Sequence, residues 1–373
     1  MSGRIPAEVF PPGEFIRDEL EARGWTQTDL AEILGRPFRL VNEILSGKRA
    51  ITPETAAGLG SAFGVDPQLW LNLEGAYRLS LVKPAGDDVE RRALIYSKAP
   101  IKEMMKRRWI ESTSDVSILE REYLRFFEVA SIDETPTLAA VARKSTDYAE
   151  ITPGQLTWLF RVKQLAASID VAPFDEARLA DLFPALRRLT SREQGAGRVP
   201  RLLAEYGIKF LVVEPLSKTK IDGAALWIDG WPVIALSFRF DRIDWFWHTL
   251  AHEIAHIHYK DSSRLDDDLN AAESEASTVR PEAEVRADRF ACDLLVPSVE
   301  MESFIARVRP QFSKVRIVQF ANRIQVHPGI ITGQLQRRDE INYSQGRDML
   351  VRVRDVVKQS ALTDGWETLK LTP

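Results

Sequence analysis

Cysteine, histidine and long apolar runs are all scarce in this chain of 373 residues. The single cysteine, Cys292, excludes an internal disulfide and is typical of a protein from a reducing compartment. No apolar run approaches the length needed to span a bilayer, and the first residues, MSGRIPAEVF, lack the apolar segment of a signal peptide. We therefore expect a cytoplasmic protein with no membrane partner. The formal net charge is −4, so bulk electrostatics require neither a nucleic acid nor an anionic membrane as partner.

The few histidines are concentrated in one place. Four of the five lie in FWHTLAHEIAHIHY, residues 246–259. Residues four apart lie one above the other on a helix, so the imidazoles of His252 and His256 converge on one point. This spacing suits two nitrogen ligands of a tetrahedral Zn²⁺ ion, with Glu253 beside the metal to take a proton from bound water. The alternative is a helix whose histidines are half-buried and merely hydrogen-bonded.

The flanking residues predict a helix with separate metal-facing and core-facing sides. Asp241 is expected to cap its N-terminus, with Asp244 three residues on as a carboxylate version of the capping box. The apolar stripe expected to face the core consists of Trp247, Leu250, Ile254 and Ile257.

A third zinc ligand is expected from PEAEVRADRFACDLLVP, residues 281–297, a helix bounded by prolines. Its small residues allow a close approach to the HExxH helix, which brings Glu284 to the metal. Asp288, one turn on, is then placed to accept the free N–H of a ligating histidine. The alternative is that Glu284 is a solvated surface carboxylate. One face of this helix carries Glu284, Ala287, Asp288, Ala291 and Leu295.

HExxH followed by E-x-x-x-D on a later helix resembles the gluzincin arrangement. The fuller string, TLAHEIAHI followed by E-x-x-A-D-x-F-A-x-x-L-L-x-P, is similar to the ImmA/IrrE family of metallopeptidases. The resemblance implies His252, His256 and Glu284 as zinc ligands and Glu253 as general base. Asp288 stands where that family commonly has Asn, a change that keeps an acceptor. The resemblance also implies a narrow protein substrate, typically a repressor or an antitoxin.

Three residues near the motif have open roles. His248, one turn before His252, is a candidate for lining the cleft, at a position where the family usually has an aromatic residue. His258 or Tyr259 is a candidate for polarising the substrate carbonyl, and the alternative is that each is an ordinary helix-end residue.

The first eighty residues contain a second module. We expect helices at residues 13–23, 28–34, 37–47 and 52–63, the second of them capped by Thr26 and ended by Gly35. Two short helices joined by a turn of this length predict a helix-turn-helix unit, whose second helix lies in the DNA major groove.

The string GRPFRLVNEILSGKRAITPETA…FGVDPQLWLNLEGAY resembles the HigA-like branch of the helix-turn-helix (XRE-type) repressors and antitoxins, over roughly residues 11–80. On that pattern Phe38, Arg39 and Asn42 project toward base edges, where Asn reads adenine and Arg reads guanine. The resemblance suggests operator DNA as one partner and a toxin as another. The residues expected to contact phosphates are Gln27, Ser46, Lys48 and Arg49.

The module is not basic overall. Residues 1–80 contain eight Lys/Arg and eleven Asp/Glu, a net charge of −3, and the positive charge is local to residues 36–49. We therefore expect a single copy to bind weakly and to need a homodimer on a palindromic operator. The alternative is a helical bundle used only for protein contacts.

Between the two motifs, residues 85–195 read as a string of helices with no chemistry that we can name. Asp229-Gly230 predicts a tight hairpin between two β-rich runs, and Pro232 predicts a strand that begins there or lies at an edge. We expect an edge of this hairpin to pair with the extended substrate. The β-rich runs are residues 208–214, 223–228 and 232–238.

The last third contains two less informative stretches. Residues 260–280 are acidic and aperiodic, which predicts a mobile loop beside the cleft, with solvated filler as the alternative. Residues 313–338 again predict helix, turn, helix, with His327 in the turn; we expect them to pack on the peptidase core, although a second DNA reader is conceivable. A helix at 348–359 and a tail follow.

We predict a mainly α protein with a small β-sheet (α+β), in which an HExxH helix packs on a short sheet of a zincin-like domain. The predicted function is a DNA-binding regulator fused to a zinc-dependent endopeptidase. The alternative is a non-catalytic antitoxin or transcription factor whose zinc-peptidase fold is a sensor or dimerisation scaffold. Glu253 favours catalysis, because a structural metal needs no general base. The predicted domains are 1–82 (helix-turn-helix), 83–195 (helical intermediate), 196–345 (metallopeptidase) and 346–373 (C-terminal helix and tail).

Overall fold

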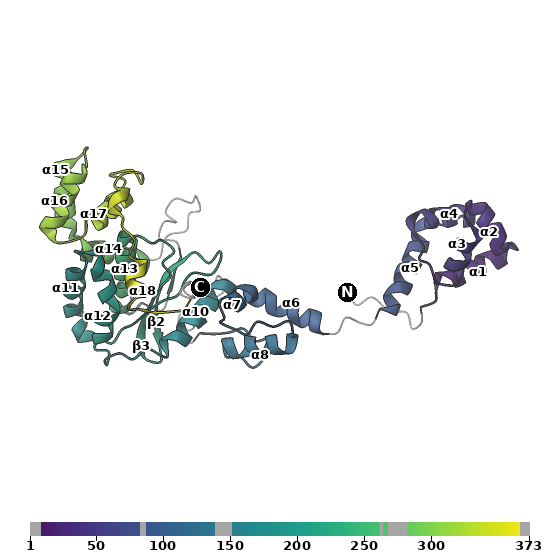
Figure 1. Cartoon of the computed structure of the whole chain (residues 1–373), viewed down its shortest axis with the longest axis horizontal. Helices are drawn as coiled ribbons and strands as arrows, with labels where there is room; N and C mark the ends of the chain where they lie inside the picture. Colours follow the sequence, from purple (N-terminus) through teal and green to yellow (C-terminus); the bar gives the residue numbers. More distant parts are fainter. Residues whose placement is uncertain (1–8, 83–86, 139–150, 262–263, 268–281, 366–373) are drawn as a thin grey trace, which may run out of the picture. The chain divides into compact units, whose positions relative to one another are not determined.

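A computed structural model describes residues 9–82, 87–138, 151–261, 264–267 and 282–365. The chain forms two compact units, Met1–Glu90 and Arg91–Pro373 (Figure 1). The boundaries expected near 195 and 345 both lie inside the second unit. No helix among the described residues is long and apolar enough to cross a membrane.

The first unit is a bundle of short helices, as predicted. The Thr26 hydroxyl accepts a hydrogen bond from the amide of Asp29, and the Asp29 carboxylate accepts one from the amide of Thr26, which completes a capping box. Gly35 ends that helix at φ 61°, a left-handed conformation that glycine adopts without steric cost. The helices are α1 (Pro12–Arg23), α2 (Gln27–Leu34), α3 (Phe38–Leu45), α4 (Pro53–Phe63) and α5 (Pro67–Leu81).

A single apolar core holds these helices together. It includes Ile16 of α1, Leu30 of α2 and Val41 of α3, all less than 3% exposed. Helices α1 and α3 are in close contact, because a Cβ placed on Gly13 would lie 2.3 Å from the carbonyl oxygen of Leu45. The guanidinium of Arg17 donates to the same carbonyl at 2.6 Å. The C-terminal end of α3 is therefore tied to α1, while its N-terminal end stays exposed.

The second unit is built on a five-stranded mixed sheet of order β4-β2-β3-β1-β5. The predicted hairpin is confirmed: Asp229 and Gly230 have φ of 51° and 85°, and β2 and β3 pair antiparallel. Pro232 is the second residue of its strand and lies opposite Trp227. Strand β1 runs parallel to both β3 and β5. The strands are β1 (Lys209–Val212), β2 (Ile221–Ile228), β3 (Trp231–Leu236), β4 (Arg264–Asp267) and β5 (Leu362–Thr363).

One of these strands corrects the prediction. Strand β4 lies within residues 260–280, which were expected to be a loop, and it pairs with β2; residues 262–263 and 268–280 of that expected loop lie outside the described residues. In the described part of the chain, β2 lies between β4 and β3, and β3 lies between β2 and β1. The pairing with β4 covers Ile221–Ala225 and leaves out the last three residues of β2. The expected pairing of the hairpin with an extended substrate stays a prediction.

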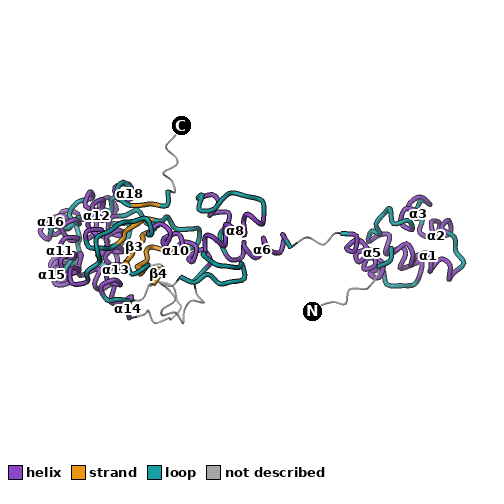
Figure 2. Tube along the Cα trace, turned by 90° about the horizontal axis from the view of Figure 1, so that it is seen from below, coloured by secondary structure: helices purple, strands orange, loops and turns teal. Residues whose placement is uncertain are grey.

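Helices cover both faces of the sheet (Figure 2). Alternate sheet residues such as Leu211 and Val213 pack against the first group of helices, whereas Phe210 and Val212 pack against the second. The predicted intermediate domain therefore shares its core with the sheet. The first group is α6 (Asp88–Lys98), α7 (Ile101–Lys106), α8 (Val116–Phe127) and α10 (Pro153–Ala166). The second is α11 (Leu179–Leu189), α12 (Val199–Glu205), α13 (Ile243–His258), α14 (Glu282–Leu295), α15 (Ser298–Val308), α16 (Lys314–Ile324), α17 (Pro328–Arg337) and α18 (Arg354–Lys358).

The C-terminal segment differs from the single helix predicted at 348–359. It forms a short 3₁₀ turn, η5 (Arg347–Met349), then α18 and β5, and Asp241 explains part of this arrangement. The Oδ1 of Asp241 accepts the amides of Val353 and Arg354, each at 2.9 Å. Other 3₁₀ turns are η2 (Glu176–Arg178) and η3 (Glu193–Arg198).

Candidate metal centre and DNA-binding face

Helix α13 carries the HExxH residues through the middle of the second unit. The expected cap is wrong, because Asp241 caps the start of α18 and the N-cap position, Arg242, makes no side-chain cap. The amide of Ile243 instead donates to the carbonyl of Val351 at 2.9 Å. Asp244 pairs with Arg242, at 2.7 Å between Oδ2 and Nη2. A distant segment thus satisfies the start of this helix.

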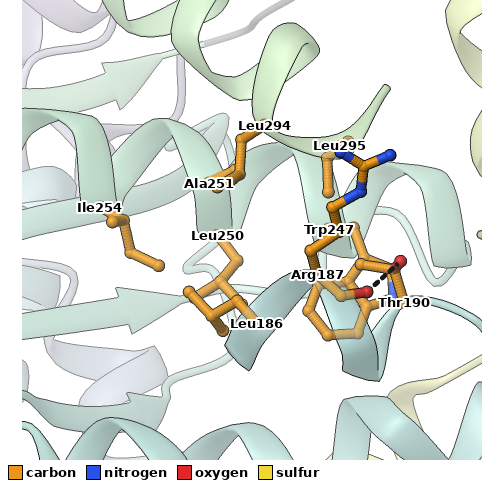
Figure 3. A pocket seen from close by; sticks show the side chains of 9 residues that line it. All are labelled: Leu186, Arg187, Thr190, Trp247, Leu250, Ala251, Ile254, Leu294 and Leu295. Atoms are coloured by element: carbon orange, nitrogen blue, oxygen red, sulfur yellow. Dashed lines mark hydrogen bonds between the residues drawn. The ribbon is translucent and has the colours of Figure 1, made fainter. Parts of the chain in front are cut away.

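The two sides of α13 are separate, as predicted. The apolar stripe, Trp247, Leu250, Ile254 and Ile257, is at most 2% exposed and belongs to the core. A small apolar pocket on this side has room for about one water-sized molecule (Figure 3). It is lined by Leu186, Arg187, Thr190, Trp247, Leu250, Ala251, Ile254, Leu294 and Leu295.

On the other side, His252 and His256 face each other. They are 0% and 3% exposed, and their Nε2 atoms lie 3.0 Å apart. Helix α14 packs along α13 through Ala287 and Ala291, both fully buried. The close approach brings Oε2 of Glu284 to 3.2 Å from Nε2 of His252 and 3.7 Å from Nε2 of His256. The Glu284 side chain is 13% exposed, so it is not a solvated surface carboxylate.

These three donor atoms fit a zinc ion. Ligand atoms at about 2.0–2.1 Å from a tetrahedral zinc lie about 3.3–3.4 Å from one another. The three distances between Nε2 of His252, Nε2 of His256 and Oε2 of Glu284 bracket that value, and the circle through these atoms has a radius of about 1.9 Å. Two imidazole nitrogens and one carboxylate oxygen are also ligands that zinc prefers.

Two further carboxylates orient the imidazoles. The Nδ1–H of His252 donates to Oδ1 of Asp288 at 2.9 Å, as predicted. The Nδ1–H of His256 donates to Oδ2 of Asp261 at 3.1 Å, a contact that the sequence analysis did not foresee. With each Nδ1 facing a carboxylate, each imidazole turns its Nε2 toward the other ring and toward Glu284.

The missed residue, Asp261, is placed by the end of α13. Lys260 has a φ of 54°, and the amide of Asp261 turns back to the carbonyl of His256 at 2.9 Å. Arg286 of α14 donates to Oδ1 of Asp261 at 2.5 Å and holds the carboxylate in place. The sequence signal that could have indicated this contact was an acidic residue in the turn that ends the helix, a few residues after His256.

The electrostatics keep the carboxylates of Glu284 and Asp288 ionised. Burial by itself would raise the pKa of Glu284, but the hydrogen bonds to His252 and His256 outweigh it, and the pKa lies well below its ordinary value. Burial also opposes ionisation of Asp288, and contacts with His248 and His252 again lower its pKa strongly.

The side chain of Glu253 lies against the sheet, next to Gly223 of β2. Its side chain is fully buried and lies against Gly223 of β2, where an added Cβ would be 2.7 Å from Oε1 of Glu253. Gly223 therefore leaves the room that this carboxylate occupies between α13 and the sheet. The sequence analysis missed Gly223, because nothing local to β2 identifies the helix that packs on it.

His248, one turn before His252, is held by contacts with neighbouring side chains. Nε2 of His248 lies 3.4 Å from Oδ1 of Asp288 and contacts the guanidinium of Arg337. Burial and the charge of Arg337 lower the pKa of His248 to about 3, so its ring is neutral. His248, His252 and Asp288 could also group around a cation, but the Arg337 guanidinium already contacts His248 there.

His258 and Tyr259 lie at the end of α13. The His258 ring packs 5.2 Å from that of Phe183, edge to face, and Arg286 lies 4.5 Å from the centre of the Tyr259 ring. These contacts are those of helix-end residues. His327 is a turn residue, as predicted, and its Nδ1 accepts the amide of Gly329 at the start of α17.

In the first unit, the predicted base-reading residues lie on the exposed side of α3. Phe38 is 50% exposed, the Arg39 side chain is 89% exposed, and Asn42 is exposed. Lys48 and Arg49 are exposed just beyond the helix, and Gln27 at the start of α2 is half-buried. Ser46 is exposed at the end of α3, and its hydroxyl donates to the carbonyl of Asn42 at 2.8 Å. We call Phe38, Arg39, Asn42, Lys48 and Arg49 the α3 face.

An acidic residue organises the α3 face and was missed by the sequence analysis. Oε1 of Glu43 accepts from Nε of Arg39 at 2.8 Å, and its Oε2 accepts from Nη1 of Arg49 at 3.1 Å. These contacts lower the pKa of Glu43, chiefly through Arg39. The spacing of Arg39 and Glu43, four residues apart on one helix, was the available signal.

Comparisons with known proteins bear on this unit. The chain matches the helix-turn-helix family over residues 16–70. Virulence-associated protein I of Dichelobacter nodosus is 36% identical over 83 residues, which cover 22% of this chain and 77% of that protein. The uncharacterized HTH-type transcriptional regulator YddM of Escherichia coli K12 is 31% identical over 84 residues, covering 22% of this chain and 89% of YddM. A solved structure of the Pseudomonas aeruginosa antitoxin HigA with the higBA promoter is 28% identical, with a TM-score of 0.19, and covers 21% of this chain and 99% of that one.

The helices of the first unit and these matches define a helix-turn-helix domain. Through that domain the chain belongs to the helix-turn-helix family, with relatives that include an HTH-type transcriptional regulator. The three relatives each cover about a fifth of the chain.

Proposed function

We propose that the protein is a DNA-binding transcriptional regulator whose second unit is a zinc-dependent endopeptidase. The observation that supports the peptidase is the group formed by Nε2 of His252, Nε2 of His256 and Oε2 of Glu284, with mutual distances of 3.0–3.7 Å. The buried Glu253, next to one ligand in the sequence, supports catalysis over a purely structural metal.

In this proposal each residue has a distinct task. His252, His256 and Glu284 hold Zn²⁺, while Asp288 and Asp261 keep the imidazoles in the tautomer that ligates. A bound zinc lowers the pKa of a water toward neutrality and polarises the scissile carbonyl. Glu253 accepts the proton of the attacking water on a carboxylate oxygen and passes it to the leaving amine.

The proposed class of substrate rests on the presence of a helix-turn-helix domain in the same chain as the proposed peptidase. A peptidase joined to a helix-turn-helix domain would act where cleavage changes transcription, so we propose a regulatory protein, such as a repressor or an antitoxin, as substrate. The test is to incubate the full zinc-loaded chain with a lysate of its host and to map new protein N-termini by mass spectrometry. We expect a small set of new termini from the wild type and none from Glu253→Gln, which should keep its zinc.

Two results would contradict the peptidase. Equal new termini from wild type and Glu253→Gln would remove Glu253 as the base. No new termini from either, with zinc bound, would favour a sensor or scaffold. Glu284→Ala is the complementary variant and should lose zinc.

The proposed DNA contacts rest on the α3 face. Arg39 and Asn42 are exposed on one side of α3, which suits paired hydrogen bonds to guanine and adenine. Lys48 and Arg49 lie where phosphates would be held. Because the positive charge is local, we propose that two copies bind a palindromic operator.

The DNA test uses fluorescence anisotropy with labelled DNA from upstream of the chain's own coding region and a scrambled control. Arg39→Ala and Asn42→Ala should each weaken specific binding by about 5–100-fold, which corresponds to about 1–3 kcal/mol. Arg201→Ala is a matched control, because Arg201 and Glu205 form the same i,i+4 pair on α12 of the second unit. Equal binding by wild type and Arg39→Ala would place the partner elsewhere and favour a protein-docking bundle.

A further inference from the structure

The two candidate histidine ligands have outer carboxylates that are held in different ways. Asp288, the partner of His252, lies within α14, so regular helix geometry fixes its backbone. Asp261, the partner of His256, lies beyond the last residue of α13, after the left-handed Lys260. A turn residue gains no such support from a helix. The position of the Asp261 carboxylate, and with it that of the His256 ring, therefore depends on other contacts.

Arg286 supplies such a contact from α14. Its Nη2 donates to Oδ1 of Asp261 at 2.5 Å, and the other oxygen, Oδ2, accepts the Nδ1–H of His256 at 3.1 Å. The amide of Asp261 also donates to the carbonyl of His256 at 2.9 Å. Each carboxylate oxygen accepts from a different donor, so the two side-chain contacts are compatible and together fix the plane of the carboxylate.

The guanidinium of Arg286 is itself supported by Tyr259. It lies 4.5 Å from the centre of the Tyr259 ring, within the range of a cation–π contact. The Asp261 side chain is 11% exposed, whereas that of Arg286 is 42% exposed. An ion pair that is open to water on one side contributes little to stability. We therefore expect Arg286 to have a small effect on unfolding, so that an effect on the metal centre can be measured separately.

Helix α14 reaches the candidate metal centre by two routes. Glu284 approaches Nε2 of His252 and Nε2 of His256 directly. Arg286, two residues on, reaches Nδ1 of His256 through Asp261. Helices α13 and α14 lie side by side (Figure 1), and the second route joins α14 to the C-terminal end of α13. The same helix thus sets the position of the carboxylate ligand and the orientation of one imidazole ligand.

We propose that Arg286 is a positioning residue of the metal centre, which fixes the Asp261 carboxylate and through it the orientation of His256. Tyr259 supports the guanidinium in this role. The inference rests on the proposed zinc site. A guanidinium has no acceptor atom and is not a zinc ligand, so Arg286 acts through Asp261.

The test measures zinc affinity of the full chain by competition with a chromophoric chelator, and the visible absorption of the Co²⁺-substituted protein as a report of ligand geometry. Loss of an outer partner of a metal ligand typically weakens metal binding about 10–100-fold, which we expect for Asp261→Ala. Arg286 lies one contact further out, so Arg286→Ala should weaken zinc binding about 3–10-fold and alter the Co²⁺ spectrum. Arg286→Lys keeps a cationic donor and should recover most of the affinity.

A double-mutant cycle separates positioning from a general effect on folding. Because Arg286 is proposed to act through Asp261, a variant that carries both Asp261→Ala and Arg286→Ala should bind zinc as Asp261→Ala does, with no further loss. Arg289→Ala is the matched control, because Arg289 is an exposed arginine on the same helix. It should leave both readouts unchanged.

Wild-type affinity and spectrum in Arg286→Ala would overturn the inference. So would additive losses in the double variant, or equal losses in Arg286→Ala and Arg289→Ala. If Arg286→Ala fails to fold, Arg286→Met takes its place, because methionine keeps an apolar stem over Tyr259 and has no donor. Neither readout needs proteolysis, so the inference is tested whether or not the chain cleaves a substrate. A wild type that binds no zinc would instead refute the proposed function, and the inference would fall with it.

Discussion

Replacing Gly223 by alanine tests the catalytic role of Glu253 without touching a zinc ligand. The new Cβ would lie 2.7 Å from Oε1 of Glu253, 3.0 Å from Cγ2 of Thr249 and 3.1 Å from Cδ2 of Leu236. The shortest contact is to the end of a flexible side chain, so the carboxylate is expected to move, and the backbone of α13 is expected to stay. None of the three nearest atoms belongs to His252, His256 or Glu284.

The expected magnitudes differ between stability and hydrolysis. Adding a methyl group to a packed core costs about 1–3 kcal/mol, and we expect the lower end because a side-chain terminus gives way. A displacement of about 1 Å in a catalytic group costs on the order of 100-fold in rate. Gly223→Ala should therefore lose about 1–2 kcal/mol of unfolding free energy and about 100-fold in cleavage, with unchanged zinc affinity.

The assay combines urea unfolding, chelator competition and the appearance of new N-termini from the substrate identified in the host lysate. Gly75→Ala is the control, because nothing lies within 4 Å of a Cβ at Gly75, in the exposed middle of α5. It should be neutral or stabilise by about 0.5–1 kcal/mol. Cleavage at the wild-type rate by folded, zinc-loaded Gly223→Ala would refute the placement of the general base against β2.

Three further predictions follow from single contacts. Asp241→Ala removes the acceptor of two amides at the start of α18 and should lower the unfolding free energy by about 1–2 kcal/mol in urea, whereas Asp241→Asn should lose less; equal stability of all three proteins would contradict the cap. His327 is half-buried, which lowers its pKa below the ordinary value of 6.5, so the unfolded state binds more protons as the pH falls below about 6.5 and stability should fall with it. Comparing urea midpoints at pH 7.5 and 5.5 should show a smaller fall in His327→Asn, which keeps a capping acceptor and does not titrate; parallel falls would exclude His327. Glu43→Gln removes a negative charge from between Arg39 and Arg49 and should tighten binding to the upstream DNA about 3–10-fold at low salt; weaker binding would show that Glu43 instead preorganises the arginines.

The ligand set was predictable because helical geometry is local. His252 and His256 are four residues apart, so spacing predicted that their rings face one another. Glu284 shares a helix face with Ala287 and Ala291, and the resemblance to the ImmA/IrrE family supplied the expectation that this face meets the two histidines. The caps of α2 were predictable for the same reason, since Thr26 and Asp29 satisfy each other's amides within one turn.

The cap of α13 was not predictable, although the residue was singled out. Asp241 stands where a capping residue belongs, but its carboxylate reaches two amides of a segment more than one hundred residues away. Its position in the sequence predicted that it caps α13, the helix that follows it directly. In the folded chain it caps the start of α18 instead. Strand β4 was not predictable for a similar reason, because its residues lie in an acidic, aperiodic stretch and only the pairing with β2 makes them a strand.

By itself, the sequence determined features that repeat within a few residues: which side of a helix is apolar, the capping box of α2, and which two imidazoles share one helix face. The tertiary structure alone decided what surrounds them. Asp261 reaches His256 through a left-handed turn, Gly223 makes room for Glu253, and Arg337 reaches His248 from a helix some ninety residues on. These contacts depend on how helices and strands pack, and packing brings together residues whose separation along the chain holds no regular period.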